Sequence, residues 1–108
     1  MIARLWSART ANSADADAYQ ALFPADALAH LGTVSGFHGA YLLRRDHDTG
    51  AELVTMTLFE SLAAIRGFAG EDYQRANVST SARNVLADID ERVRHFTVVR
   101  APGDTAIH

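Results

Sequence analysis

Apolar and polar residues alternate, or apolar residues cluster, in four short runs along the chain, and each run predicts a β-strand. The runs span residues 2–9, 36–45, 52–59 and 93–100. A polar segment that contains glycine, 46–50, separates the second run from the third. This spacing predicts an antiparallel hairpin in the middle of the chain.

Between the strands, apolar residues recur at the spacing of an α-helix. The first helical segment follows Asn12, which favours a helix N-terminus, and it ends at Gly32. Pro24 interrupts this segment and predicts a kink or two successive short helices. A second helix is expected between a capping Ser61 and a terminating Gly70.

A further helix is predicted to begin at Thr80 or Ser81 and to carry apolar residues as far as Ile89. The main elements follow the order β-α-β-β-α-β, which is the split βαβ plan of a ferredoxin-like α+β fold. This plan places the helices on one face of a four-stranded antiparallel sheet. Residues 1–101 are expected to form this single domain, and 102–108 to be a flexible tail.

The third strand is apolar on both of its faces, since its sequence over 53–59 is Leu-Val-Thr-Met-Thr-Leu-Phe. One helical layer covers only one face of a sheet. At about 25 cal/mol per Å2, a few hundred Å2 of uncovered apolar sheet would forfeit several kcal/mol. We therefore expect a homodimer in which the sheets of two copies face each other and form a dimeric α/β barrel.

Composition narrows the classes of function. Of the 108 residues, 48% are hydrophobic and 21% charged, which is ordinary for a globular domain. The chain has no cysteine and no lysine, which excludes disulfides, zinc–thiolate sites, iron–sulfur clusters and lysine Schiff bases. The net charge of −3 argues against nucleic acid or an acidic membrane as a partner. No apolar run approaches the roughly 18 residues of a membrane span, and no signal segment is evident, so a cytoplasmic location is expected.

The element order and four stretches of the chain carry a family resemblance. The stretches are Met1–Trp6, Gly36–Tyr41, the junction Thr57–Ser61 with the following Ile65–Phe68, and Val93–Phe96. Together they resemble the antibiotic biosynthesis monooxygenase family, which belongs to the dimeric α/β-barrel superfamily. The resemblance implies the fold strongly and the activity weakly. Characterised relatives include cofactor-independent monooxygenases of aromatic polyketides, haem-degrading enzymes and small quinol oxygenases.

The haem-degrading branch carries an Asn on the first strand, a Trp on the helix after the third strand, and a His further along. Here the Trp position is Phe68, the His position falls near Asn77 or Val78, and the Asn position falls near Trp6 or Ser7. None of the three is kept, and without the His no proximal iron ligand is evident. No cofactor and no metal are therefore expected. A haem-binding relative is kept as a third hypothesis.

Three residues are candidates for catalysis. His95 lies mid-strand, a position that by itself favours a structural role, but its imidazole suits the proton abstraction that cofactor-free oxygenation requires. Arg4 is expected on the core side of the first strand, where a guanidinium either pairs with a carboxylate such as Glu60 or Asp88 or binds an anion. Tyr41 is the alternative partner for that anion.

Four further residues are candidates for binding the substrate. Trp6, Phe68 and Tyr73 are the expected aromatic walls of a pocket, although large aromatics also simply fill cores. His38 is expected to face the dimer barrel. The leading hypothesis is a monooxygenase that oxidises a phenolic, quinol or polyketide-type aromatic substrate with O2. The alternative is a non-catalytic module of the same fold that binds a small aromatic ligand or serves in a stress response.

Overall fold

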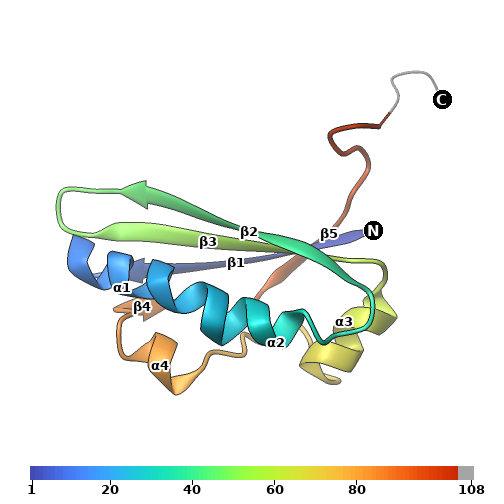
Figure 1. Ribbon diagram of the computed structural model, residues 1–108, viewed down its shortest axis with the longest axis horizontal. Coiled ribbons are helices and arrows are strands. Elements are labelled where there is room, and N and C mark those ends of the chain that lie inside the picture. The colour runs from blue at the N-terminus through green and yellow to red at the C-terminus, as the bar shows by residue number, and fades with distance from the viewer. Residues whose placement is uncertain (105–108) are drawn as a thin grey trace.

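The computed structural model describes residues 1–104 of the chain. A sheet lies on one side of the molecule and every labelled helix lies on the other (Figure 1). The strands of the described part are β1 (Ile2–Thr10), β2 (Phe37–Asp46), β3 (Ala51–Phe59), β4 (Asp88–Ile89) and β5 (Arg94–Thr97). The helices are α1 (Ser13–Phe23), α2 (Ala29–Leu31), α3 (Leu62–Ala69) and α4 (Thr80–Arg83), with a π-helical segment, Pro24–Leu28, between α1 and α2.

All strand pairings in the sheet are antiparallel. β1 lies in the centre, with the β2–β3 hairpin on one side and the two short strands β4 and β5 on the other. β4 pairs with the C-terminal part of β1, through Ala8 and Ile89, and β5 pairs with the N-terminal part, through Ile2 and Thr97. This is the expected α+β, ferredoxin-like arrangement, except that the fourth strand is divided in two.

The prediction of a helix over residues 80–89 was wrong in its extent. α4 is a single turn, and Ile89 lies in a strand instead. The cause is the edge of β1, where the Ala87 N–H donates to the Arg9 carbonyl at 2.8 Å and the Asp90 N–H donates to the Ser7 carbonyl at 2.9 Å. These backbone bonds hold the segment in an extended conformation, which overrides its helical spacing, and Arg9 adds exposed ion pairs to Asp88 and Asp90.

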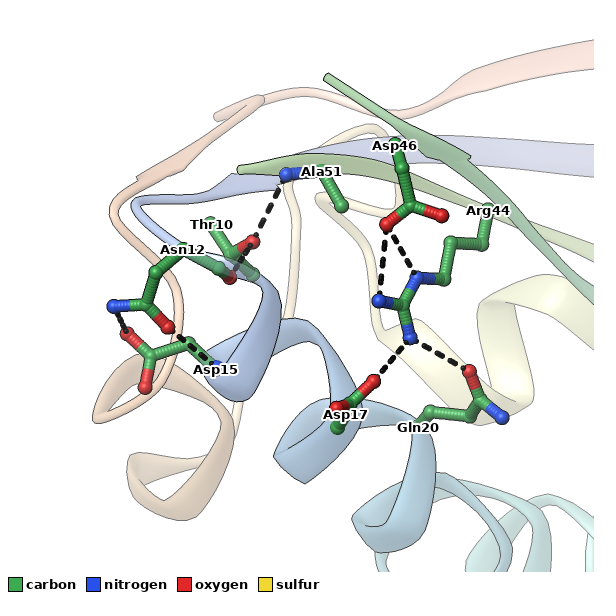
Figure 2. Close-up of polar contacts among 8 residues, drawn as sticks. All are labelled: Thr10, Asn12, Asp15, Asp17, Gln20, Arg44, Asp46 and Ala51. Atoms are coloured by element: carbon green, nitrogen blue, oxygen red, sulfur yellow. Dashed lines mark hydrogen bonds and ion pairs between the residues drawn. The ribbon is translucent and has the colours of Figure 1, made fainter. Parts of the chain in front are cut away.

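Two predicted helix starts are confirmed by their caps. Asn12 Oδ1 accepts a hydrogen bond from the Asp15 backbone N–H at 2.7 Å (Figure 2). Ser61 Oγ accepts one from the Ala64 N–H at 3.1 Å. The kink is confirmed too, because beyond Pro24 the chain continues as the π-helical segment before it resumes as α2.

Strict alternation along β2 predicts Phe37, Tyr41 and Leu43 on one face, and this prediction is wrong at one end of the strand. The register shifts between Phe37 and Gly39, so His38 is an extra, bulged residue. Phe37 consequently packs in the core under the helices, whereas Tyr41 and Leu43 lie on the opposite face and are 53% and 50% exposed. A single bulge thus reverses the relation between Phe37 and Tyr41 that strict alternation predicts.

The core lies between the sheet and the helices in two clusters. Their buried members are Tyr19, Phe23, Leu53 and Ala82 in the first, and Leu31, Phe59 and Ile65 in the second. Strand alternation turns a further set of apolar side chains to the face without helices. From the pairing register this set comprises Ala3, Leu5, Tyr41, Leu43, Val54, Met56, Leu58 and Phe96. The third strand therefore has two apolar faces, and helices cover only one of them (Figure 1).

Two smaller features complete the fold. Of the expected tail over 102–108, the part up to Asp104 forms a turn in which the Asp104 N–H donates to the Ala101 carbonyl at 3.1 Å, and 105–108 lie outside the described residues. Within residues 1–104, no helix is both long enough and apolar enough to span a membrane.

Candidate functional site

Arg4 lies at the centre of the candidate site. It is on the helix-facing side of β1 and is only 6% exposed. Its direct neighbours across the sheet are Thr57 on β3 and His95 on β5. Residues that are directly opposite in antiparallel strands share a face, so this register places Arg4, Thr57 and His95 in one row.

The hydrogen bonds of Arg4 go to neutral acceptors. Nη1 donates to the backbone carbonyl of Tyr73 and also contacts His95 Nε2 at 3.0 Å. Since a guanidinium can only donate, Nε2 must accept this bond, and the proton of the neutral imidazole must then be on Nδ1. The geometry therefore assigns the tautomer of His95.

Neither carboxylate that was considered as a partner for Arg4 is paired with it. Asp88 binds Arg9, and Glu60 Oε2 lies 3.9 Å from His38 Nε2. Within residues 1–104 no carboxylate forms an ion pair with Arg4. The alternative of a structural ion pair with Glu60 or Asp88 is thus wrong, and the buried cation has no counter-charge in the described part of the chain.

The charges at the site follow from burial. Burial lowers the pKa of Arg4 to about 10, well below the usual value of an arginine, which leaves the guanidinium charged near neutral pH. Burial, and secondly the charge of Arg4, lower the pKa of His95 below its usual 6.5. At neutral pH the site therefore holds a cation beside a neutral imidazole.

Aromatic rings enclose this polar pair. The guanidinium carbon of Arg4 lies 5.8 Å from the centre of the Phe68 ring on α3. The Tyr73 ring meets the His95 ring edge-on, with 5.3 Å between centres. The exposed Arg66 covers the same tyrosine, also at 5.3 Å. Cation–π contacts compensate part of the cost of burying a charge, but they do not supply a counter-ion.

A cavity of about 110 Å3 lies between the sheet and the helices beside Arg4. Its aromatic and apolar lining comes from Trp6, Tyr19, Phe23, Ala27, Leu31, Phe68 and Val93, and its polar lining from Arg4, Thr55, Thr57 and Asn77. A groove of about 280 Å3 shares Ala27, Leu31, Phe68 and Asn77 with the cavity and adds Asp26, His30 and Ser79. The groove is therefore the mouth of the cavity, and Ser79 Oγ closes one side of it by donating to Asp26 Oδ2 at 2.6 Å.

His95 lines a different hollow from the cavity. It borders an outer groove of about 490 Å3, together with Tyr73 and Phe96. Arg4 lies between the two spaces, since it lines the cavity and contacts His95. Arg4 and His95 are thus approached from two sides, and a molecule in the cavity would meet Arg4 first.

The structure brings together five of the seven predicted site residues and separates the other two. Arg4, Trp6 and Phe68 line the cavity, and Tyr73 and His95 adjoin it through Arg4.

Tyr41 is on the opposite face of the sheet from His95, so within one protomer the two cannot act on the same ligand. His38 lies on the bulge beside Glu60 and does not line the cavity. The bulge and the strand alternation account for both corrections.

Several cavity residues were not foreseen. Thr55 and Thr57 alternate with apolar residues on β3, a pattern that indicates their shared face but not their role. Tyr19 is buried against the sheet, and burial raises the pKa of its hydroxyl. Asn77 belongs to an irregular segment without a periodic signal, so sequence reasoning had no means to place it.

No cluster of three or more metal-ligating side chains occurs within residues 1–104. Cofactor independence itself stays a prediction.

Comparison with known proteins establishes what the chain is similar to. No protein-family model matches the sequence, and no curated protein matches it. A solved structure from Bacillus cereus, described as an antibiotic biosynthesis monooxygenase, is 14% identical, covers 97% of each chain and has a TM-score of 0.67. A variant of SnoaB, a cofactor-independent oxygenase from Streptomyces nogalater, is 19% identical over 95% of this chain and 98% of that one, with a TM-score of 0.63. A second SnoaB structure has a TM-score of 0.60 to this chain. At these identities the likeness establishes the fold, which this chain shares with antibiotic biosynthesis monooxygenases.

Proposed function

We propose that the protein is a cofactor-independent monooxygenase that oxidises a phenolic or quinol ring with O2 in the cavity between sheet and helices. One observation supports this best: Arg4, a buried guanidinium, lines an aromatic cavity and has no carboxylate partner within residues 1–104. A buried cation of this kind is suited to stabilise a phenolate. The fold shared with a cofactor-independent oxygenase agrees with the proposal.

The chemistry needs an anion, O2 and a site that excludes water. Loss of the phenolic proton gives an electron-rich anion that reacts directly with O2. In the balanced reaction a ring C–H becomes a C=O, one atom of O2 enters the product, and the other leaves as water. The ring supplies all four electrons that O2 accepts, so the reaction needs neither flavin nor metal.

His95 is the proton acceptor in this proposal. In the free protein its Nε2 is occupied by Arg4 Nη1 at 3.0 Å, and the charge of Arg4 helps to lower its pKa. A hydroxyl that binds beside Arg4 would take over this contact, and the phenolate formed would neutralise the charge that disfavours the imidazolium. His95 therefore becomes basic enough to take the proton of the hydroxyl only while the phenolate forms beside Arg4.

Oxygen uptake tests the proposal. Purified protein should be colourless and should consume O2 with a small panel of phenols and hydroquinones, one mole per mole of quinone formed. Arg4→Gln should abolish this activity, whereas Arg66→Gln should leave it unchanged, because Arg66 is exposed and lies outside the cavity. Absence of uptake across the panel, or a stoichiometric flavin or metal in the protein, would contradict the proposal.

A second candidate function is a binding module without turnover. The observation that favours it is the position of His95, which borders the outer groove and not the cavity. A base that does not touch the ligand cannot take its proton. If the wild-type protein binds phenols saturably but consumes no O2, the protein is a binding module and not an oxygenase.

The homodimer belongs to the same proposal. The apolar side chains on the open face of the sheet include Met56 at its centre and Phe96, which is 47% exposed, near its edge. A second copy covers this face, which also shields the sheet beneath the cavity from water. Met56→Asp should give monomer or aggregate in sedimentation, and Met56→Leu should not. A stable wild-type monomer at micromolar concentration would refute the dimer.

A further inference from the structure

Arg4 has hydrogen-bond donors that no atom of residues 1–104 uses. A guanidinium carries five N–H donors, and here the two on Nη1 are directed to Tyr73 and His95. Nε and Nη2, with three donors, have no partner in the described part of the chain. No side-chain nitrogen or oxygen there is both fully buried and without a partner, so Nε and Nη2 are not sealed by protein. Arg4 lines the cavity, so a ligand bound there comes within reach of its guanidinium.

The unused donors form one particular edge of the guanidinium. Nε–H and the adjacent Nη2–H are parallel and match the two oxygens of a carboxylate, which they bind with two short, charge-assisted bonds. A phenolate offers one oxygen and would leave one of these donors unpaired. An unpaired donor in a buried site lowers affinity, so the edge favours a two-oxygen anion.

The cavity limits the rest of the ligand. Its volume of about 110 Å3 is less than that of the ~150 Å3 apolar cavity that takes up one benzene molecule. The cavity alone therefore holds no more than one ring, and any further part of the ligand extends into the adjoining groove of about 280 Å3. Trp6 and Phe68 supply flat apolar walls against which one aromatic ring can stack.

We propose that the ligand of this cavity is a monocyclic aromatic carboxylate, held by a two-fold hydrogen bond to Nε and Nη2 of Arg4. This inference rests on the proposed function, because it names the substrate class of the same cavity. The substrate would be a benzoate whose ring also carries the phenolic hydroxyl groups that are oxidised.

Trp6 provides a direct measurement, since it is the only tryptophan in the chain and lines the cavity. Wild-type protein is titrated with benzoate, with benzamide, which has the same shape without the charge, and with phenol, and the tryptophan emission is followed. Benzoate should bind about ten-fold or more tightly than either of the others. Equal affinities, or tighter binding of phenol, would overturn the inference.

Substitution of Arg4 separates the shape of the donor edge from its charge. Arg4→Lys keeps a positive charge but loses the parallel donors, so benzoate should bind about ten-fold more weakly while benzamide is unchanged. Arg66→Gln is the matched control, because it removes a nearby exposed charge from outside the cavity. If Arg66→Gln weakens benzoate binding as much as Arg4→Lys does, non-specific attraction by nearby positive charge explains the binding and the inference fails. Should Arg4→Lys not fold, the wild-type titrations decide alone.

A final comparison separates this inference from the proposed function. O2 uptake is measured with 2,5-dihydroxybenzoate and with hydroquinone, which lacks the carboxylate. Uptake with a lower KM for the acid supports both ideas. Benzoate binding without any O2 uptake supports the inference and contradicts the oxygenase. Uptake with hydroquinone but neither binding nor uptake of the acids contradicts the inference and leaves the oxygenase standing.

Discussion

Two arginines on separate strands of the sheet have opposite surroundings. Arg44, on β2, donates from Nη1 to Asp17 at 2.7 Å and to Gln20 at 3.1 Å, and from Nε to Asp46 at 3.0 Å (Figure 2). Hydrogen bonds to Asp17 and Asp46 raise its pKa. Arg4, on β1, is buried with neutral acceptors only, and burial lowers its pKa to about 10.

The difference separates a structural role from a functional one. Arg44 joins the end of β2 to α1, and its charge is matched by two carboxylates at the surface. The lowered pKa of Arg4 corresponds to roughly 3 kcal/mol of unfavourable burial, at about 1.4 kcal/mol per pKa unit. No ion pair within residues 1–104 offsets this cost. Under the proposed function, an anion bound in the cavity supplies the missing counter-charge.

The difference between the two arginines should disappear if Arg4 is given a carboxylate partner, as Arg44 already has. Thr57 lies directly across the sheet from Arg4, so Thr57→Asp would place a carboxylate beside the guanidinium. The new ion pair should occupy the anion site and weaken benzoate binding about a hundred-fold, the largest effect that we expect. Fluorescence titration measures it.

Thr57→Asn is the matched control, since asparagine has nearly the same shape as aspartate but carries no charge. It should reduce benzoate affinity only slightly. If the two variants lose affinity equally, crowding of the cavity and not charge is responsible, and the assignment of Arg4 as an uncompensated anion site is wrong.

His95 is the next residue by which the comparison can be sharpened. It is one of only two acceptors that Arg4 has within residues 1–104, so His95→Ala should destabilise the fold by about 1–3 kcal/mol. Each kcal/mol should lower the melting temperature by roughly 4–8 °C in a domain of this size. In an Arg4→Met background the same change should cost less, because no buried cation then needs the acceptor. Unchanged melting of the single variant would mean that the contact is not formed in solution, and it would leave His95 a free base in the outer groove.

Strand alternation was sufficient to predict one half of the site. It places Arg4 and Trp6 on the helix-facing side of β1, and it predicts the faces of the last strand, including that of His95. Neither result depends on long-range structure, because a period of two residues determines the face once one residue is known to be in the core. The capped helix after Ser61, which carries Phe68, could be predicted for the same local reason.

The part of the site that strand alternation does not predict depends on contacts between segments that are distant in the sequence. Alternation fails at His38, where one extra residue moves Tyr41 to the open face. Helical spacing fails at Ile89, where backbone hydrogen bonds hold the chain on the edge of β1. The Tyr73 carbonyl, which binds Arg4 from a segment without periodicity, has no signal in the sequence at all. That no carboxylate among residues 1–104 pairs with Arg4 is likewise a property of the whole fold and has no local signal.

Acid should lower the stability of the fold by protonating His95. This effect should be smaller than that of the His95→Ala substitution. Burial and the charge of Arg4 lower the folded-state pKa of His95 below the unfolded value near 6.5. The unfolded chain therefore binds a proton more readily, and stability is lost as the pH falls from 6.5 towards the lowered value. The melting temperature of the wild type should decline over this interval, and that of His95→Gln should decline less. Parallel curves for the two proteins would show that other groups cause the decline.

The smallest effect is expected at Arg44, the other side of the comparison. Arg44→Gln removes the contacts to Asp17 and Asp46, but surface ion pairs contribute little because water and salt screen them. The melting temperature should therefore fall only slightly, and the fall should be smaller still at high salt. Benzoate affinity should be unchanged, because the bonds of Arg44 join β2 to α1 and do not reach the cavity. A loss of benzoate binding in Arg44→Gln would mean that α1 positions the cavity wall formed by Tyr19 and Phe23, and the division between a structural and a functional arginine would not hold.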